Sequence, residues 1–449
     1  MKATFPGMGS AGAKARALRP DAETAALLIC GGDERLALDA RTGLNRYGCG
    51  PVPDPGLIAF SSSTASTISP AGFAAAQALH ARLSAFASAA DAYAAGAADL
   101  RLRLAVDCGL PPAQAKTLIL SPSGTDVHQV AARLARGSAS APLTIILPEP
   151  CETGRGVPAA LQASGRIHPV RLREEDGRPR AEVDVDDDVE KACKAAIAGS
   201  GRVLLCLLDQ SKTGLVAPSG ACARALKQQF GDALSVLVDA CQFRLSPQSL
   251  RAYLDAGFDV AVTGSKFLGG PAFSGALLRP LGAEAVDDGA EAPNLGLLLR
   301  WEAAMAELAA FRALPDARVA ALALDFGRAV EDWLDRSPAF ERLPAPPLSR
   351  PAPDAWDAQP TIFSFLPIAD GRPLSATETQ ALYARLRGVR LGQPAPVGRR
   401  AGEPVSALRL ALGARQITAA LTRADGVRRL IAEALAALDR TATQIAAAD

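Results

Sequence analysis

Two short apolar runs, each followed by a chemically functional side chain, constrain the fold of this chain more than any other feature. Residues 235–239 (SVLVD) and 259–263 (DVAVT) have the pattern of buried β-strands. The helix-like segment between them is long enough to connect neighbouring strands of a parallel sheet. Asp239 and Lys266 therefore both follow strand ends, on the edge where open α/β sheets bind their ligands.

A lysine and a carboxylate at such an edge suit Schiff-base chemistry with pyridoxal 5'-phosphate (PLP). The lysine amine binds the aldehyde, and the carboxylate keeps the pyridine nitrogen protonated so that the ring accepts electrons. The alternative at this point is structural, with Asp239 as a turn residue and Lys266 as a solvated loop residue.

Four motifs occur in order in this region: Asp239-x-x-Gln242, Thr263-Gly-x-Lys266, Gly270-Pro271 and Gly275-x-Leu277. In this order they resemble the fold-type I PLP-dependent enzymes, especially the class V aminotransferase and cysteine desulfurase-like group. The resemblance implies an α/β fold-type I transferase, with a large domain built on a mainly parallel seven-stranded sheet and a smaller α/β C-terminal domain. We expect an N-terminal segment lining the active site at 1–54, a large PLP-binding domain at 55–295 and a small domain at 296–449.

Composition excludes several other classes of function. With 48 basic and 47 acidic residues the net charge is +1, which provides no basic surplus to attract nucleic acid or anionic lipid. The 8 cysteines and 3 histidines show no metal-ligand spacing, so we predict no metal site and a reducing, cytoplasmic environment. No apolar run is long enough to span a membrane, so a soluble protein is expected.

The segment 117–134 predicts a strand, a Ser-Gly-Thr turn and a helix that begins immediately. Backbone N–H groups at the start of a helix form an anion site, so Ser123, Gly124 and Thr125 are predicted to bind the cofactor phosphate. An ordinary capped helix is the alternative. The resemblance favours the phosphate site and adds Ser265 to it.

The resemblance also assigns roles around the cofactor ring. Gln242 and Ser211 are expected near the 3-oxygen of the cofactor, and Asp239 at the ring nitrogen. Relatives usually place a histidine or aromatic ring over the pyridine, but the turn at 149–158 contains none, so Thr153 or Glu152 is expected there.

Substrate contacts are predicted at two places. Arg409 lies on a small-domain strand where the group holds the arginine that binds the substrate carboxylate; the alternative is a strand-end salt bridge. Asn45, Arg46 and Tyr47 stand in a loop rich in glycine and proline, where they contact substrate or pack at a subunit boundary. The resemblance implies a homodimer with shared active sites.

These assignments predict a PLP-dependent enzyme acting on an amino acid or related amine through a Lys266 Schiff base. Aminotransferase chemistry is the first expectation, and a PLP-dependent lyase is the alternative. Cysteine desulfurases need a nucleophilic cysteine shortly before the position of Arg409, and the segment 391–407 has none, which disfavours desulfuration. A Rossmann-type oxidoreductase is disfavoured because no G-x-G-x-x-G run occurs, and a non-catalytic relative because both Lys266 and Asp239 are retained.

Two structural predictions concern the N-terminal third of the chain. The apolar residues 25–30 predict a short strand, and leucine and alanine at helical spacing predict one long helix from 71 to about 106.

Overall fold

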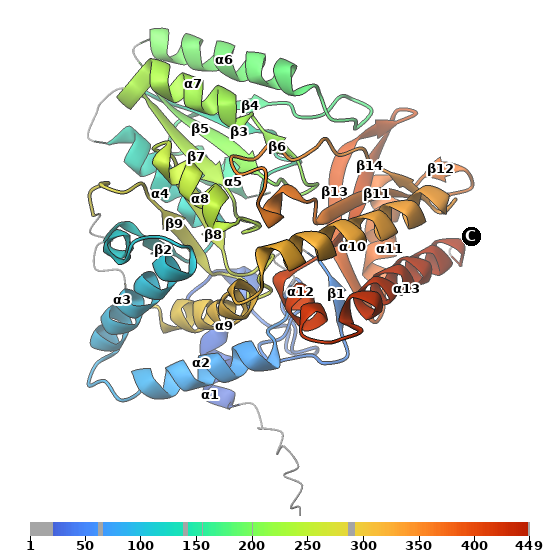
Figure 1. The fold of residues 1–449 in the computed structure, drawn as a ribbon, viewed down its shortest axis with the longest axis horizontal. Helices are drawn as coiled ribbons and strands as arrows, with labels where there is room; N and C mark the ends of the chain where they lie inside the picture. The colour runs from blue at the N-terminus through green and yellow to red at the C-terminus, as the bar shows by residue number, and fades with distance from the viewer. Residues whose placement is uncertain are drawn as a thin grey trace, which may run out of the picture.

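The computed structural model describes residues 21–61, 66–137, 142–154, 156–199, 201–285 and 292–447. The first 20 residues of the predicted N-terminal segment lie outside the described part. Two β-sheets with helices packed around them form the molecule (Figure 1). We describe the larger sheet first because it contains Asp239 at one of its strand ends.

The larger sheet is mainly parallel, as predicted. Along the sheet its strands are β2 (Ile119–Ser121), β9 (Gly275–Leu278), β8 (Asp259–Thr263), β7 (Leu234–Asp239), β5 (Arg202–Asp209), β3 (Leu143–Pro148) and β4 (Arg166–Val170). The strands from β8 to β4 are parallel, whereas β9 is antiparallel to both β8 and β2. A two-residue strand, β6 (Val216–Ala217), pairs with β5 outside this path.

Helices cover both faces of this sheet, which explains why its strands are apolar throughout. Along β7, Val236 and Val238 belong to the main hydrophobic core, while Leu237 between them belongs to a second cluster on the other face. A strand buried on both faces has no polar side to expose. The covering helices are α4 (Gly124–Arg136), α5 (Val157–Leu161), α6 (Glu182–Ala198), α7 (Gly220–Phe230) and α8 (Pro247–Asp255).

The smaller sheet contains β1 (Ile58–Phe60), β13 (Val389–Arg400), β14 (Glu403–Ala411), β11 (Ile362–Ala369) and β10 (Phe340–Arg342) in that order, with β12 (Arg372–Pro373) paired to β11. Only β1 pairs in parallel among the described strands of this sheet, and its partner is β13. An early segment of the chain therefore completes a sheet built otherwise from late segments. The helices α10 (Asp316–Arg336), α11 (Ala376–Arg385), α12 (Ala414–Leu421) and α13 (Gly426–Ala446) accompany this sheet (Figure 1).

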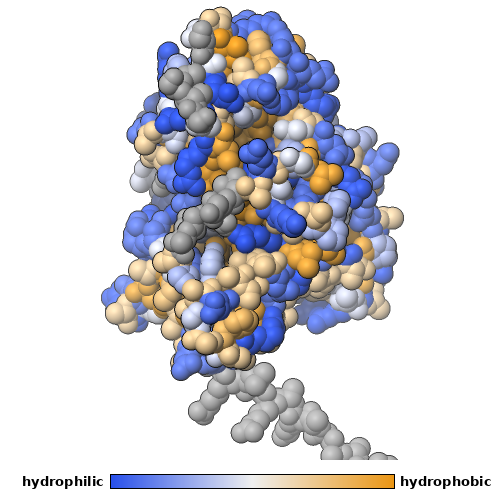
Figure 2. Space-filling model, turned by 90° about the vertical axis from the view of Figure 1, so that its left-hand side faces the viewer, coloured by the Kyte–Doolittle hydropathy of each residue, from blue (hydrophilic) through white to orange (hydrophobic). Residues whose placement is uncertain are grey.

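The remaining helices pack beside the larger sheet. They are α1 (Ala22–Leu28), α2 (Pro70–Leu83), α3 (Ala89–Asp107) and α9 (Leu295–Arg312). Short 3-10 turns occur at Glu34–Leu36, Pro112–Thr117, Gly231–Ala233 and Trp356–Ala358. The face on the left-hand side of Figure 1 carries hydrophobic groups among charged ones (Figure 2). Among the described residues, no helix has both the length and the hydropathy of a membrane span.

Two predictions for the N-terminal third are wrong. The residues 25–30 do not form a strand, because Asp21 caps a helix there, its side chain accepting the Glu23 N–H at 3.0 Å. The long helix predicted from 71 to about 106 is two helices, because Ser88 caps a new helix start by accepting the Asp91 N–H at 3.1 Å. In both places a local cap determines the structure rather than the apolar pattern.

Candidate active site

Asp239 ends β7 with its carboxylate held from three directions. Its Oδ1 accepts the Cys241 N–H at 3.1 Å, and its Oδ2 accepts the Thr153 hydroxyl at 3.4 Å. The Nε2 atom of His128 lies 3.3 Å from the same Oδ2. All three contacts place hydrogen-bond donors or positive charge at the carboxylate, which therefore has a fixed position and orientation at the strand end.

His128 and Asp239 form a buried pair in which each group shifts the pKa of the other towards its charged form. Burial alone would raise the pKa of Asp239, but the charge and hydrogen bond of His128, together with the charge of Lys266, hold that pKa well below its ordinary value. Burial likewise opposes the charged form of His128, yet Asp239 and the Gly124 carbonyl raise the histidine pKa above its ordinary value. The Nδ1 atom of His128 lies 2.7 Å from that carbonyl oxygen. Both shifts favour the charged forms, a carboxylate on Asp239 beside a protonated His128.

Lys266 is half-buried and follows the end of β8, the strand next to β7. Its charge is among those that lower the pKa of Asp239, so the amine and the carboxylate lie on the same edge of the sheet. Within the described part of the chain, the Lys266 amine has no hydrogen bond or ion pair. No described protein group therefore occupies the Lys266 amine.

The residue after Lys266 fixes the loop. The Phe267 N–H donates to the Gln242 carbonyl at 3.2 Å, and the Phe267 carbonyl accepts the Ala414 N–H at 2.8 Å. The Phe267 ring stacks on Trp356 with centroids 5.4 Å apart and meets Phe311 edge-on at 5.2 Å. This buried aromatic cluster anchors the backbone beside the amine, so Lys266 has a defined starting position.

The helix α4 begins at the same edge of the sheet. Ser123 caps it, and its hydroxyl donates to the Asp126 carboxylate at 2.7 Å, so this hydroxyl is already engaged. Within the described residues, the N–H groups of Gly124 and Thr125 meet no protein acceptor. A Cβ atom at Gly124 would lie 2.8 Å from the Cys241 sulfur, so only glycine permits this approach of the helix to the strand end. These two N–H groups lie where the sequence predicts the anion site.

Ser211, Gln242 and Ser265 are all buried beside this edge. The Ser211 hydroxyl donates to Glu152 Oε2 at 2.6 Å, and the Ser265 carbonyl accepts the Ser66 hydroxyl at 2.6 Å. Glu152 also accepts hydrogen bonds from Arg173 and Thr213, which commits its carboxylate to a buried network. Of the two alternatives in this turn, Thr153 is therefore the one that contacts Asp239.

Arg409 lies in β14 and is buried. Its Nη1 donates to the Lys212 carbonyl at 3.0 Å and its Nη2 to the Gln393 carbonyl at 2.5 Å, while its Nε has no partner among the described residues. A Cβ atom at Gly392 would lie 2.8 Å from that Nε, so the glycine leaves room for the guanidinium. Burial lowers the pKa of Arg409 to about 10. The salt-bridge alternative is not what the structure shows, because the described contacts of this side chain are to carbonyl oxygens.

The three predicted residues of the N-terminal loop differ in exposure and contacts. The Asn45 side chain accepts the N–H groups of Tyr47 at 2.9 Å and Cys49 at 3.1 Å, which holds the turn. Arg46 is exposed, with its guanidinium 5.8 Å from the centre of the Tyr47 ring. Arg390 of β13 donates to the Gly48 carbonyl at 2.7 Å and so attaches this loop to the smaller sheet.

The sequence reasoning missed two residues of this site. One is His128, whose spacing of four from Gly124 places both residues on one side of a helix. Lys212 was not considered. It follows β5, its backbone N–H donates to the Glu152 carbonyl at 3.1 Å, and its amine donates to the Pro150 carbonyl at 3.1 Å. Only three-dimensional contacts bring Lys212 to the site.

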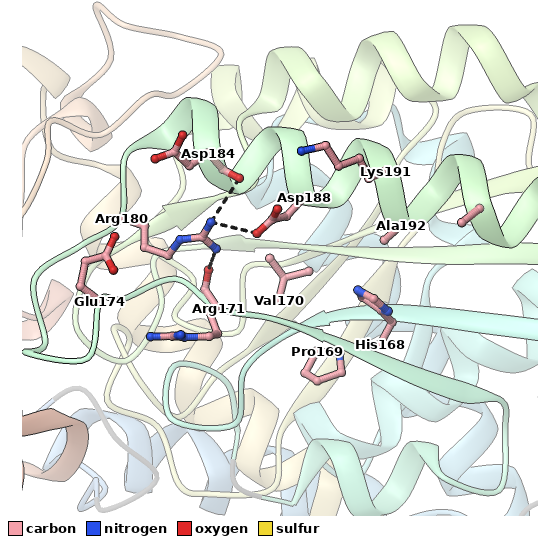
Figure 3. Close-up of a pocket in the computed structure, with 11 residues that line it drawn as sticks. His168, Pro169, Val170, Arg171, Glu174, Arg180, Asp184, Asp188, Lys191 and Ala192 are labelled. Carbon is pink, nitrogen blue, oxygen red and sulfur yellow. Dashed lines mark hydrogen bonds and ion pairs between the residues drawn. The ribbon is translucent and has the colours of Figure 1, made fainter.

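A pocket of about 710 Å³ lies elsewhere, between β4 and α6, and contains none of the predicted residues (Figure 3). Arg180 reaches across it to the Asp188 carboxylate at 2.8 Å and donates to the Arg171 carbonyl at 2.9 Å. The Asp188 carboxylate thereby compensates the charge of Arg180 inside the pocket. We assign this pocket no function. Among the described residues, no group of histidine, cysteine, aspartate or glutamate side chains is arranged to hold a metal ion.

No family model and no curated protein sequence matches this chain. Solved structures do. A NifS-like protein has a TM-score of 0.56 at 13% identity, covering 85% of this chain and 99% of its own. The cysteine desulfurase CsdA from Escherichia coli has a TM-score of 0.53 at 18% identity, covering 86% and 94%. The cystine C-S lyase C-DES, in complex with cysteine persulfide, has a TM-score of 0.53 at 17% identity, covering 85% and 97%.

These likenesses confirm the predicted fold class. The chain has the fold-type I architecture shared by these enzymes, over most of its length. Cysteine desulfurases are among the structures with this fold, so the fold itself does not disfavour desulfuration. The argument against that reaction rests on the missing cysteine in 391–407.

Proposed function

We propose that this protein is a PLP-dependent enzyme that acts on an amino acid or related amine. The observation that carries the proposal is Asp239 at the end of β7, with its pKa held well below the ordinary value, on the same sheet edge as the Lys266 amine, which has no hydrogen bond or ion pair among the described residues. The N–H groups of Gly124 and Thr125 at the start of α4, which meet no acceptor in the described part of the chain, add a candidate anion site to that edge. A carboxylate, an amine and an anion site fit the ring nitrogen, the aldehyde and the phosphate of PLP.

Bound PLP supplies a ring that accepts electrons from the substrate carbon next to the amine. Asp239 would keep the proton on the ring nitrogen, and His128 would support the charge of Asp239. The backbone N–H groups of Gly124 and Thr125 would hold the phosphate, assisted by Ser265. Lys266 would hold the aldehyde; once the substrate amine replaces it there, its released amine would remove and return the proton at the substrate carbon as general base and acid.

Arg409 would bind the substrate carboxylate. Its guanidinium is fixed by two carbonyl oxygens and has no carboxylate partner among the described residues, so its charge is available to an anionic ligand. Gln242 and Ser211 complete the proposed surroundings of the ring. Thr153, whose hydroxyl contacts Asp239, occupies the turn in which relatives place an aromatic ring.

The experiment is reconstitution of the purified protein with PLP. We expect a visible absorbance band and, after borohydride reduction and digestion, PLP attached to the peptide that contains Lys266. Lys266→Ala should show neither, whereas Lys116→Ala, at an exposed lysine, should behave like the unchanged protein. PLP that fails to attach to Lys266 in the folded protein would contradict the proposal.

Amino transfer is the first candidate reaction, and a lyase reaction is the second. The second is favoured by Thr153, because a small hydroxyl side chain stands where relatives stack a ring. The two reactions have different products. Amino transfer passes the amine to a 2-oxo acid, whereas elimination releases ammonia and a 2-oxo acid from one substrate, so assays of both products with a panel of amino acids separate them. A homodimer in the cytoplasm remains our expectation for the assembly.

A further inference from the structure

Lys212 connects the two halves of the candidate site. It stands between β5 and β6, and its amine donates to the Pro150 carbonyl in the turn that contains Thr153. Its own carbonyl accepts the guanidinium of Arg409 at 3.0 Å. The lysine and the arginine are therefore adjacent, although the chain separates them by almost half its length.

The negative charges around Lys212 are already matched. Glu152 is a carboxylate whose charge acts on Lys212, and it accepts hydrogen bonds from Arg173, Ser211 and Thr213. Burial opposes its charged form, yet Arg173 and the hydroxyl donors lower the pKa of Glu152 below its ordinary value. Asp239 is likewise matched by His128. Lys212 and Arg409 are thus two cations without a carboxylate partner among the described residues.

The pKa of Lys212 agrees with the lack of a carboxylate partner. Burial, then the charge of Arg409, lower the pKa of Lys212 to about 8, and the charge of Lys266 acts in the same direction. Like charges raise the free energy of a protonated amine, and an anion placed between them would lower it. Lys266 and the α4 anion site are already assigned to the cofactor, which leaves Lys212 and Arg409 for the substrate.

We propose that Lys212 and Arg409 bind two separate anionic groups of one substrate, so that the enzyme acts on an amino acid with a second acidic group on its side chain. This inference rests on the proposed function, because it takes the bound cofactor as the reacting group. Arg409 binds the carboxylate next to the amine, and Lys212, half-buried at the turn after β5, binds the distal acid.

The test compares ligands that differ by one charge. Calorimetric titration of the PLP-loaded protein with glutarate and succinate, against valerate and butyrate of matched chain length, should show the dicarboxylates binding about tenfold more tightly, which is about 1.4 kcal/mol. Lys212→Met should remove most of this preference, with the larger loss of affinity for the dicarboxylates. Arg409→Met should weaken both classes of ligand.

Matched variants keep the result interpretable. Lys212→Arg retains the charge and should retain the preference, and Lys191→Met, at an exposed lysine on α6, should match the unchanged protein. Equal affinity for both ligand classes in the unchanged protein, or a preference that survives in Lys212→Met, overturns the inference. PLP attachment at Lys266 is measured separately by mass spectrometry. Absence of the charge preference in the unchanged protein, with attachment intact, therefore rejects this inference and leaves the proposed function standing.

Discussion

Arg350 offers a quantitative test of how the site is supported, because two fully buried carboxylates share its guanidinium. Its Nη2 is paired with Asp209, at the end of β5, and its Nη1 lies 3.1 Å from Asp357 Oδ2. The Tyr253 hydroxyl donates to the same Asp209 at 2.9 Å. The cluster joins the larger sheet to the segment that carries Trp356 and thereby supports the aromatic anchor beside Lys266.

Replacing Arg350 with methionine should cost about 3–5 kcal/mol of unfolding free energy at neutral pH. Methionine fills much of the volume, so the loss is chiefly electrostatic. Removing one partner of a buried ion pair leaves an uncompensated charge, and the measured cost of such a change is about 3–5 kcal/mol. Here both Asp209 and Asp357 would lose their cation, and both side chains are inaccessible to solvent.

The pH dependence gives this prediction its sign. Burial raises the pKa of Asp209 above its ordinary value even with Arg350 present, and removing the cation raises it further. A carboxyl group with a raised folded-state pKa contributes stability that is present below its unfolded pKa and lost as pH rises through its folded pKa. The deficit of Arg350→Met should therefore be largest at neutral pH and shrink as the pH falls towards the ordinary aspartate range.

Equilibrium unfolding in guanidinium chloride, followed by tryptophan fluorescence, measures the loss, since Trp356 is buried next to Asp357. Arg342→Met is the matched control. Arg342 also faces two carboxylates, Asp335 at 2.7 Å and Glu331 at 3.6 Å, but its side chain is 34% exposed, so its loss should be below about 1 kcal/mol. A loss of that small size for Arg350→Met, or a loss that grows in acid, would refute the reasoning.

Two further changes test the strand-end geometry. Gly124→Ala places a Cβ atom 2.8 Å from the Cys241 sulfur and should cost about 1–3 kcal/mol in thermal unfolding; Cys241→Ala in the same chain should restore most of it, and no restoration would place the strain elsewhere. His128→Gln removes the cation beside Asp239 and should release PLP several times faster during dialysis, followed by absorbance. Unchanged release would mean that Asp239 needs no such support.

The alternation of strands and helices was predictable from the sequence. A sheet covered by helices on both faces needs strands that are apolar throughout, and these appear as short apolar runs. Asp239 and Lys266 were predicted from the same runs, since Asp239 ends one of them and Lys266 stands three residues after the other. The strand predicted at 25–30 failed because a short apolar run fits either structure, and the deciding group, the Asp21 side chain, lies four residues earlier.

The supporting groups of the site were less accessible to sequence reasoning. Lys212 contacts Arg409, and Arg350 contacts Asp209, although the residues of each pair are far apart in the sequence. Sequence periodicity indicates only local structure, so it does not predict such pairs. His128 could have been found from the sequence. It follows Gly124 by four residues, so a helix over this segment places the two residues on the same side.

The pairing of β1 with β13 has a consequence for how the chain is made. Ile58 is synthesised long before its partner Val389, because the pairing joins segments far apart in the chain. Until then the edge of β1 has no neighbour, and the smaller sheet is incomplete. Fragments that end before about residue 389 should therefore leave β1 without its partner, whereas a chain that includes β13 can complete the smaller sheet.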